Sequence, residues 1–249
     1  MERVIFKNSR AQSLIGYLYP SESKSIIIFS HGFTGDKSER GKFESTAQVL
    51  RESGYAVLRF DYSGCGESDD DTLTVAKQVN DLQSAIAFVR LKGYERIGLL
   101  GYSLGGLIAL KCFDGIETIV LWAPVTNKIS YTWDKRYSKE QLTEFLVKGY
   151  ATKIKKNSIR STVLIDKQML IDRESVNQRM LLKYVTCPVL IIHGDCDTNV
   201  PYTDSQNAIS LLSNHSELKI LNDADHWFSH SFDNVKTLSV AWFLKNLMR

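Results

Sequence analysis

Ser103 lies in the middle of the pentapeptide Gly-Tyr-Ser-Leu-Gly at residues 101–105. An apolar run precedes this pentapeptide and a second one follows it, so we expect a strand before the serine and a helix after it. A strand-to-helix turn this tight lifts the hydroxyl above the sheet and leaves little room for side chains, which accounts for the flanking glycines. The pattern predicts a nucleophilic serine.

A serine hydroxyl becomes a nucleophile at neutral pH when a histidine takes its proton and an acid orients that histidine. Of the five histidines, His226 is the best candidate because it follows the last predicted strand, on a loop at the same edge of the sheet as the serine. Asp195 and Asp197 follow another buried strand, and either could reach the imidazole. We interpret His193, at the end of that strand, as a structural residue.

The tetrahedral intermediate of acyl transfer also needs two N–H donors that point at its oxyanion. The residue after the nucleophile supplies one of them in the strand-serine-helix arrangement, which predicts the backbone N–H of Leu104. The second should come from the loop at residues 30–35, Ser-His-Gly-Phe-Thr-Gly, which follows a strongly apolar run. We predict the backbone N–H of Phe33.

Short β-branched runs alternate with amphipathic stretches along most of the chain, a pattern typical of parallel sheets covered by helices. The runs predict strands at 3–7, 13–19, 25–30, 56–61, 96–101, 118–123, 189–193 and 218–221. The amphipathic stretches predict helices at 43–52, 73–91, 104–113, 203–212 and 232–247. Together they indicate a three-layer α/β/α domain with a mostly parallel central sheet.

Residues 125–186 interrupt this alternation and carry thirteen lysines and arginines against six acidic residues. We interpret this segment as an inserted cap or lid, with residues 1–124 and 187–249 forming the core domain. Its candidates for contact with a substrate hydroxyl are Tyr131, Asp134 and Gln141, and an ordinary surface position is the competing interpretation for each. A basic lid would favour an anionic acyl donor.

The composition narrows the class of protein further. A net charge of +3 over 249 residues is too small for a protein that binds mainly to phosphates, so nucleic acid is not an expected partner. Charges in the first seven residues predict no signal peptide, and no apolar run reaches the roughly 18 residues of a membrane span. The four cysteines have neither zinc-site spacing nor disulfide-scaffold density. We therefore expect a cytoplasmic protein without stable membrane insertion; the sequence does not decide between a monomer and a homodimer.

Four blocks of the sequence resemble the α/β-hydrolase superfamily, and within it the serine esterases of the cinnamoyl or feruloyl type. They are residues 31–35, 59–68, 101–106 and 193–201, the last followed by an Asp-His pair at 225–226. The resemblance implies the α/β-hydrolase fold with an inserted lid. It also implies that the second carboxylate of the His-Gly-Asp-Cys-Asp block, Asp197, is the catalytic acid. Recognition of phenolic esters is implied by this resemblance alone.

The expected reaction is hydrolysis of a small-molecule acyl ester through an acyl-enzyme intermediate on Ser103, with no metal or organic cofactor. A thioesterase, a monoacylglycerol lipase or an acylaminopeptidase would use the same three side chains, so the sequence leaves these alternatives open. An alternative of a different class is a non-catalytic ligand-binding protein that keeps the fold. The presence of nucleophile, base and acid together argues against that last alternative.

Overall fold

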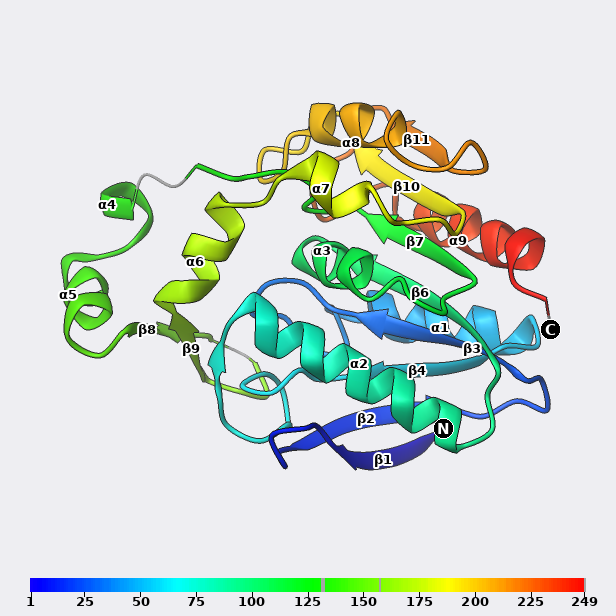
Figure 1. The fold of residues 1–249 in the computed structure, drawn as a ribbon, viewed down its shortest axis with the longest axis horizontal. Coiled ribbons are helices and arrows are strands. Elements are labelled where there is room, and N and C mark those ends of the chain that lie inside the picture. Colours follow the sequence, from blue (N-terminus) through cyan, green and yellow to red (C-terminus); the bar gives the residue numbers. More distant parts are fainter. Residues whose placement is uncertain (131–132, 157, 249) are drawn as a thin grey trace.

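Eight strands form the central sheet of the computed structural model, which describes residues 1–130, 133–156 and 158–248 (Figure 1). The strands are β1 Glu2–Lys7, β2 Ser13–Tyr19, β3 Ser25–Ser30, β4 Ala56–Phe60, β6 Arg96–Tyr102, β7 Thr118–Trp122, β10 Val189–Gly194 and β11 Glu217–Leu221. Every strand predicted from the sequence is present, with each boundary within one residue of the expected one. The mostly parallel α/β architecture is confirmed.

The spatial order of the strands is β1-β2-β4-β3-β6-β7-β10-β11. Strand β2 runs antiparallel to both β1 and β4, whereas β4, β3, β6, β7, β10 and β11 are mutually parallel. In a parallel sheet all strands end at the same edge, so the loops that follow β3, β6, β10 and β11 lie close together. That edge is where ligands bind in open α/β sheets.

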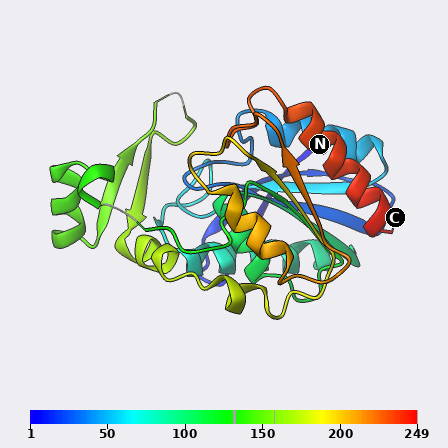
Figure 2. The same cartoon turned by 90° about the horizontal axis from the view of Figure 1, so that it is seen from above.

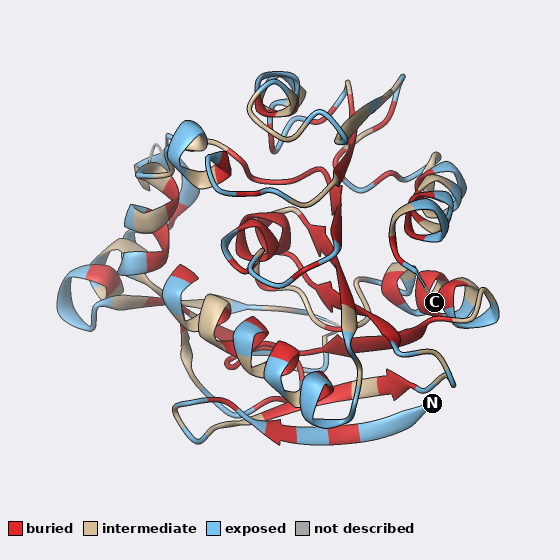
Figure 3. Cartoon of the chain, turned by 45° about the vertical axis from the view of Figure 1, so that its right-hand side comes forward, coloured by how far each residue is buried: buried red, intermediate tan, exposed pale blue. Residues whose placement is uncertain are grey.

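Both faces of the sheet are covered by helices, and the central strands are buried accordingly (Figure 3). In β3, Ile26 and Ile28 belong to one core cluster while Ile27 and Phe29 belong to the other, because successive side chains point to opposite faces. One cluster includes side chains of α2 Val75–Leu91, α3 Leu104–Lys111 and α8 Tyr202–Ile209. The other includes side chains of α1 Lys42–Glu52 and α9 Phe232–Asn246.

The segment between β7 and β10 extends beyond one end of the main sheet (Figures 1 and 2). Its elements are α4 Trp133–Arg136, α5 Lys139–Val147, β8 Tyr150–Ile154, β9 Thr162–Asp166, α6 Lys167–Glu174 and α7 Gln178–Leu182. Strands β8 and β9 form a small sheet with β5 Thr72–Leu73, which comes from the core part of the chain. This sheet was not predicted from the sequence. It joins the segment to the part of the chain between β4 and α2, where β5 lies.

Strand β5 also corrects one predicted boundary. The sequence pattern places the start of a helix at Leu73, but Leu73 pairs with β9 and the helix α2 begins at Val75. Thr74 follows the strand and caps the helix, since its side chain accepts a hydrogen bond from the backbone N–H of Lys77 at 3.1 Å. The apolar side chain of Leu73 fits the helical pattern equally well, so periodicity could not separate the two.

Aromatic side chains form the interior of the first half of this segment. Phe145 of α5 lies 5.6 Å from the ring of Trp133 and 5.1 Å from that of Tyr137, in edge-to-face arrangements. The indole N–H of Trp133 donates to a carboxylate oxygen of Glu174 at 3.1 Å, which links α4 to α6.

Within the described residues, no helix has the length and apolar character needed to cross a membrane.

Candidate active site

Ser103 occupies the sharp turn between β6 and α3. Its φ of 53° and ψ of −116° lie outside the regions that residues with side chains favour. Main-chain hydrogen bonds hold this conformation: the Ser103 N–H donates to the Trp122 carbonyl at 2.9 Å, and the Ser103 carbonyl accepts from the Val125 N–H at 3.0 Å. Strand β7 and the residues that follow it therefore support the strained turn.

The glycines around Ser103 are required by close backbone approaches. A Cβ atom on Gly105 would lie 2.0 Å from the carbonyl oxygen of Ser30, and one on Gly101 would lie 2.7 Å from the carbonyl oxygen of Gly105. Real Cβ atoms essentially never make contacts as short as either distance. The steric interpretation of the pentapeptide therefore agrees with the geometry of the turn.

The structure brings Ser103, His226 and Asp197 together from three distant parts of the chain. His226 Nε2 lies 3.1 Å from Ser103 Oγ, and His226 Nδ1 lies 2.6 Å from Asp197 Oδ2. A proton on Nδ1 is donated to the carboxylate, which leaves the Nε2 lone pair facing the serine hydroxyl. The arrangement can therefore accept the serine proton. Of the two aspartates left open by the residue pattern, Asp197 is the one that contacts the imidazole.

Both oxygens of the Asp197 carboxylate are occupied by donors. Oδ1 accepts the backbone N–H groups of Asn199 and Val200 at 2.8 and 2.9 Å, and Oδ2 accepts from His226 and from His193 Nε2, which is 3.0 Å away. Burial opposes the charged form of this carboxyl, but the hydrogen bonds from the two histidines outweigh it and hold the pKa of Asp197 well below its usual range. The group stays ionised at neutral pH.

His193 contacts the acid more directly than the sequence suggested. Its Nε2 faces Asp197 Oδ2, and its Nδ1 lies 2.7 Å from the hydroxyl of Ser205. The ring is fully buried at the end of β10. The sequence pattern therefore placed His193 correctly at the end of a strand but did not predict its contact with Asp197. The available signal was a histidine four positions before the acid, on the same strand-to-loop turn.

The loop after β3 is fixed around the predicted donor Phe33. The Gly32 N–H donates to Glu39 Oε1 at 2.6 Å, and His31 uses Nδ1 to donate to the Gly32 carbonyl at 3.0 Å. Burial lowers the pKa of His31, so its imidazole is neutral. Leu104 is the first residue of α3, where backbone N–H groups have no partner within the helix. The oxyanion role of Phe33 and Leu104 stays a prediction.

A cavity of about 520 Å³ opens beside the serine. Ser103, His226, Phe33 and Trp227 line it, together with side chains from the β8 and α6 region. Its volume lies within the range of about 300–1,000 Å³ that small-molecule sites occupy. The serine, the histidine and the predicted oxyanion loop therefore share one space that a small substrate can enter.

The structure describes two of the three residues predicted to contact a substrate hydroxyl, Asp134 and Gln141. Tyr131 lies outside the described residues. Asp134 is exposed on α4, and it is absent from the described lining of the cavity. Gln141 is absent from that lining too, because its side chain completes the capping box at Ser138 and donates to the Thr152 carbonyl at 2.9 Å. Gln141 thus has a structural role within this segment, and contact of Asp134 or Gln141 with a substrate hydroxyl stays a prediction.

The fold and the site together define a serine hydrolase of the α/β-hydrolase class. The sequence profile of the serine aminopeptidase S33 family matches residues 21–181, and the chain belongs to this family. It is 28% identical to the protein YfhR of Salmonella typhi over 210 residues, which are 83% of this chain and 66% of that protein. It thus spans slightly less than two thirds of that relative.

Two further comparisons extend this relationship. The chain is 30% identical to the proline iminopeptidase of Lactobacillus delbrueckii subsp. bulgaricus over 142 residues, or 53% of this chain and 45% of that protein. The structure of Est1E from Butyrivibrio proteoclasticus with bound ferulic acid superposes with a TM-score of 0.79. At 21% identity, covering 99% of this chain and 100% of that one, the match shows a shared fold.

Proposed function

We propose that this protein hydrolyses carboxylic esters through a covalent acyl-enzyme intermediate. The observation that carries the proposal is the continuous hydrogen-bond chain from Ser103 through His226 to Asp197. As Ser103 Oγ attacks the ester carbonyl carbon, His226 Nε2 takes the hydroxyl proton, and it then gives this proton to the departing alcohol oxygen. A water molecule attacks the acyl-enzyme in the same way, with His226 again as base, and releases the acid. Asp197 stabilises the imidazolium in both steps.

In this mechanism the backbone N–H groups of Phe33 and Leu104 stabilise the oxyanion. Each donor of this kind contributes about 3 kcal/mol to the transition state in mutagenesis of other serine hydrolases. The hydrogen bonds of Gly32 and His31 support the assignment of Phe33, since they fix the backbone on its N-terminal side. The position of Leu104 at the start of α3 supports the second donor.

We propose that the natural substrate is a small aromatic ester of the cinnamoyl or feruloyl type. Support comes from the ferulic acid bound to Est1E, which shares the fold, and from the rings of Phe33 and Trp227 in the cavity lining. Thioesters, monoacylglycerols and acylated peptides are alternative substrates for the same three side chains. A cytoplasmic location stays a prediction of the sequence, and the choice between a monomer and a homodimer stays open.

An aminopeptidase is the second candidate function, favoured by the family name and by the proline iminopeptidase relative. Such an enzyme must accept a protonated amino terminus beside the scissile bond. Six lysines and arginines line the described cavity, against two acidic side chains. A cationic substrate would be repelled by this surrounding, so the charge of the cavity favours the esterase proposal.

The experiment compares the wild-type protein with Ser103→Ala and with Ser210→Ala, a control that removes an exposed hydroxyl at the end of α8. The substrates are p-nitrophenyl butyrate, methyl ferulate, a butyryl thioester and proline p-nitroanilide. We expect ester turnover to fall about 10⁴-fold or more in Ser103→Ala and to stay unchanged in Ser210→Ala.

A fluorophosphonate probe reports on the nucleophile independently of the substrate. We expect it to label wild-type protein and the Ser210→Ala variant, but not Ser103→Ala. Unlabelled wild-type protein with a normal thermal unfolding curve would favour the non-catalytic ligand-binding alternative. Turnover that survives in Ser103→Ala would remove this serine from the mechanism.

A further inference from the structure

The cavity beside Ser103 has a large excess of positive charge. Its described lining contains the acidic Asp36 and Glu39, and the basic side chains Arg40, Arg136, Lys153, Lys155, Lys156 and Arg173. Burial raises the pKa of Glu39 to about 7, so one of the two acids is only partly ionised near neutral pH. A concave surface of this charge attracts anions and excludes cations.

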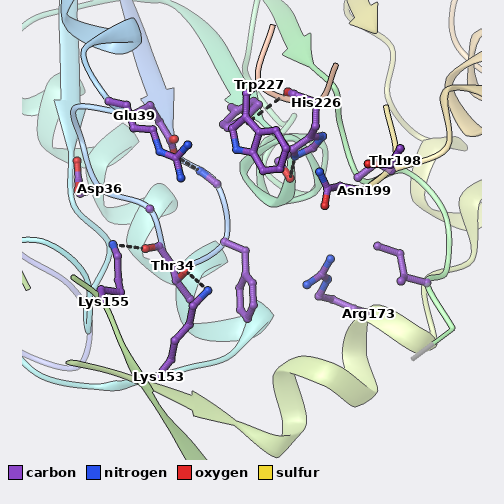
Figure 4. A pocket seen from close by; sticks show the side chains of 18 of the residues that line it. Thr34, Asp36, Glu39, Lys153, Lys155, Arg173, Thr198, Asn199, His226 and Trp227 are labelled. Carbon is purple, nitrogen blue, oxygen red and sulfur yellow. Dashed lines mark hydrogen bonds between the residues drawn. The ribbon is translucent and has the colours of Figure 1, made fainter. Parts of the chain in front are cut away.

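Lys153 and Lys155 are the best-defined part of this surface. Lys153 belongs to β8, and Lys155 follows Ile154, the last residue of that strand, whose side chain is exposed to solvent. Figure 4 shows both lysines reaching toward Thr34. Lys153 Nζ donates to the Thr34 hydroxyl at 3.1 Å, and Lys155 Nζ donates to the Thr34 carbonyl at 2.5 Å.

These contacts position the two ammonium groups without neutralising them. Each ammonium has three N–H donors, and the bond to Thr34 is the one that the structure describes for each. Within the described part of the chain, neither lysine lies within 4.0 Å of a carboxylate. Burial lowers the pKa of Lys153, and the positive charges of Lys155 and Arg136 lower it further. The negative charge of an anion bound here would offset the repulsion among these positive groups.

The cationic groups also adjoin the loop that bears the predicted oxyanion donor. Lys153 Nζ lies 5.6 Å from the centre of the Phe33 ring, and the guanidinium of Arg173 lies 5.1 Å from the same centre. In Figure 4, Arg173 extends from α6 toward the space that His226 and Lys153 also face. An anion among these side chains would therefore lie in the same cavity as the ester carbonyl at Ser103.

We propose that Lys153 and Lys155, with Arg173 across the cavity, form a subsite for an anionic group of the substrate, a carboxylate or a phosphate. The inference rests on the proposed function in so far as that substrate is an ester cleaved at Ser103. Binding of the anion itself does not depend on catalysis. The two parts can therefore be tested separately.

The kinetic test uses two p-nitrophenyl esters of equal acyl length, mono-p-nitrophenyl suberate and p-nitrophenyl octanoate. We expect the wild-type protein to prefer the anionic ester, and the ratio of the two kcat/KM values to fall about tenfold in Lys153→Gln/Lys155→Gln, as expected for two partly exposed charges. Glutamine keeps a donor for Thr34. The control Lys139→Gln/Lys183→Gln removes two exposed lysines that are absent from the described cavity lining, and should leave the ratio unchanged.

The binding test uses Ser103→Ala protein, which needs no turnover. Calorimetric titration compares monomethyl suberate and octyl phosphate with the neutral dimethyl suberate. We expect at least one anion to bind about tenfold more tightly than the neutral diester, and this advantage to vanish when the Lys153→Gln/Lys155→Gln change is added. Which anion binds more tightly distinguishes a carboxylate subsite from a phosphate subsite.

The outcomes separate the two proposals. Equal binding of anionic and neutral probes, or an advantage that persists in the glutamine variant, would overturn the subsite. Anion binding in a wild-type protein that hydrolyses no ester would overturn the esterase proposal and leave the subsite standing. Ester hydrolysis without any preference for the suberate ester would do the reverse.

Discussion

Replacing Asp197 with asparagine should abolish most of the activity while the protein stays folded. The change keeps the size of the side chain and removes its charge. Its consequence follows from the partners of the two carboxylate oxygens. Oδ1 accepts two backbone N–H groups, from Asn199 and Val200, whereas Oδ2 faces the imidazoles of His193 and His226.

The new amide nitrogen has to replace one of these two oxygens. At the Oδ1 position it would face two main-chain donors that cannot change, whereas at the Oδ2 position it would face imidazoles that can shift a proton. We therefore expect the nitrogen to donate to His226 Nδ1. The imidazole proton then moves to Nε2 and faces Ser103 Oγ, so the ring can no longer accept the serine proton.

This wrong tautomer predicts a fall in kcat of about 10⁴-fold, with little change in KM. Loss of charge-assisted hydrogen bonds at a buried site should also lower the free energy of unfolding by about 1–3 kcal/mol. The assays are steady-state hydrolysis of p-nitrophenyl butyrate and urea unfolding followed by circular dichroism. The matched control is Asp195→Asn, the same change two positions earlier, which should keep activity within a few-fold of wild type.

Two results would refute this reasoning. A folded Asp197→Asn variant with kcat within tenfold of wild type would show that the carboxylate does not orient His226. A larger loss in Asp195→Asn than in Asp197→Asn would assign the acid to the other aspartate.

Three further predictions concern stability and are checked by urea unfolding. Gly105→Ala places a Cβ 2.0 Å from the Ser30 carbonyl oxygen, so it should lower the free energy of unfolding by about 3 kcal/mol or more. A decrease below about 1 kcal/mol would contradict the claim that the turn is rigid. Lys37 Nζ lies 2.6 Å from Asp61 Oδ2, and both side chains are almost fully buried. Because Lys37→Met removes the counter-charge of this carboxylate, it should lower the free energy of unfolding by about 3–5 kcal/mol. The pKa of Glu39 is raised by burial from 4.5 to about 7, so the folded state binds the extra proton and the stability from this group is lost as pH rises between these values. Glu39→Gln should therefore show a smaller loss of stability from pH 5 to pH 8 than wild type, and an identical loss would contradict the assignment.

Local sequence features were enough to predict the strands of the main sheet and most of the helices around it. The run Ile26–Phe29 is apolar at every position, which fits a strand covered on both faces, and the structure buries these side chains completely. The glycines around Ser103 similarly reveal a turn that no larger residue allows. These signals are local because the period of a strand and the steric demands of a turn involve only a few neighbouring residues.

The small sheet of β5, β9 and β8 was not predicted, for the opposite reason. Its strand β5 has two residues, and its pairing partner β9 begins about ninety positions later, with Thr72 opposite Leu164. No periodicity can be read from two residues. Gln141 illustrates the same limit, since only the structure shows that its side chain is used for helix capping and for the Thr152 carbonyl.

The sequence by itself determined the order of the strands along the chain, the nucleophile turn and the candidates for base and acid. Tertiary structure alone decided that Asp197 rather than Asp195 contacts His226, that His193 shares this carboxylate, and that Lys153 meets Thr34, 119 positions away. These contacts join loops whose separation in the sequence carries no information about their distance in space. They are set by the packing of the main sheet and of the segment between β7 and β10, which brings Ser103, His226 and Lys153 into the lining of one cavity.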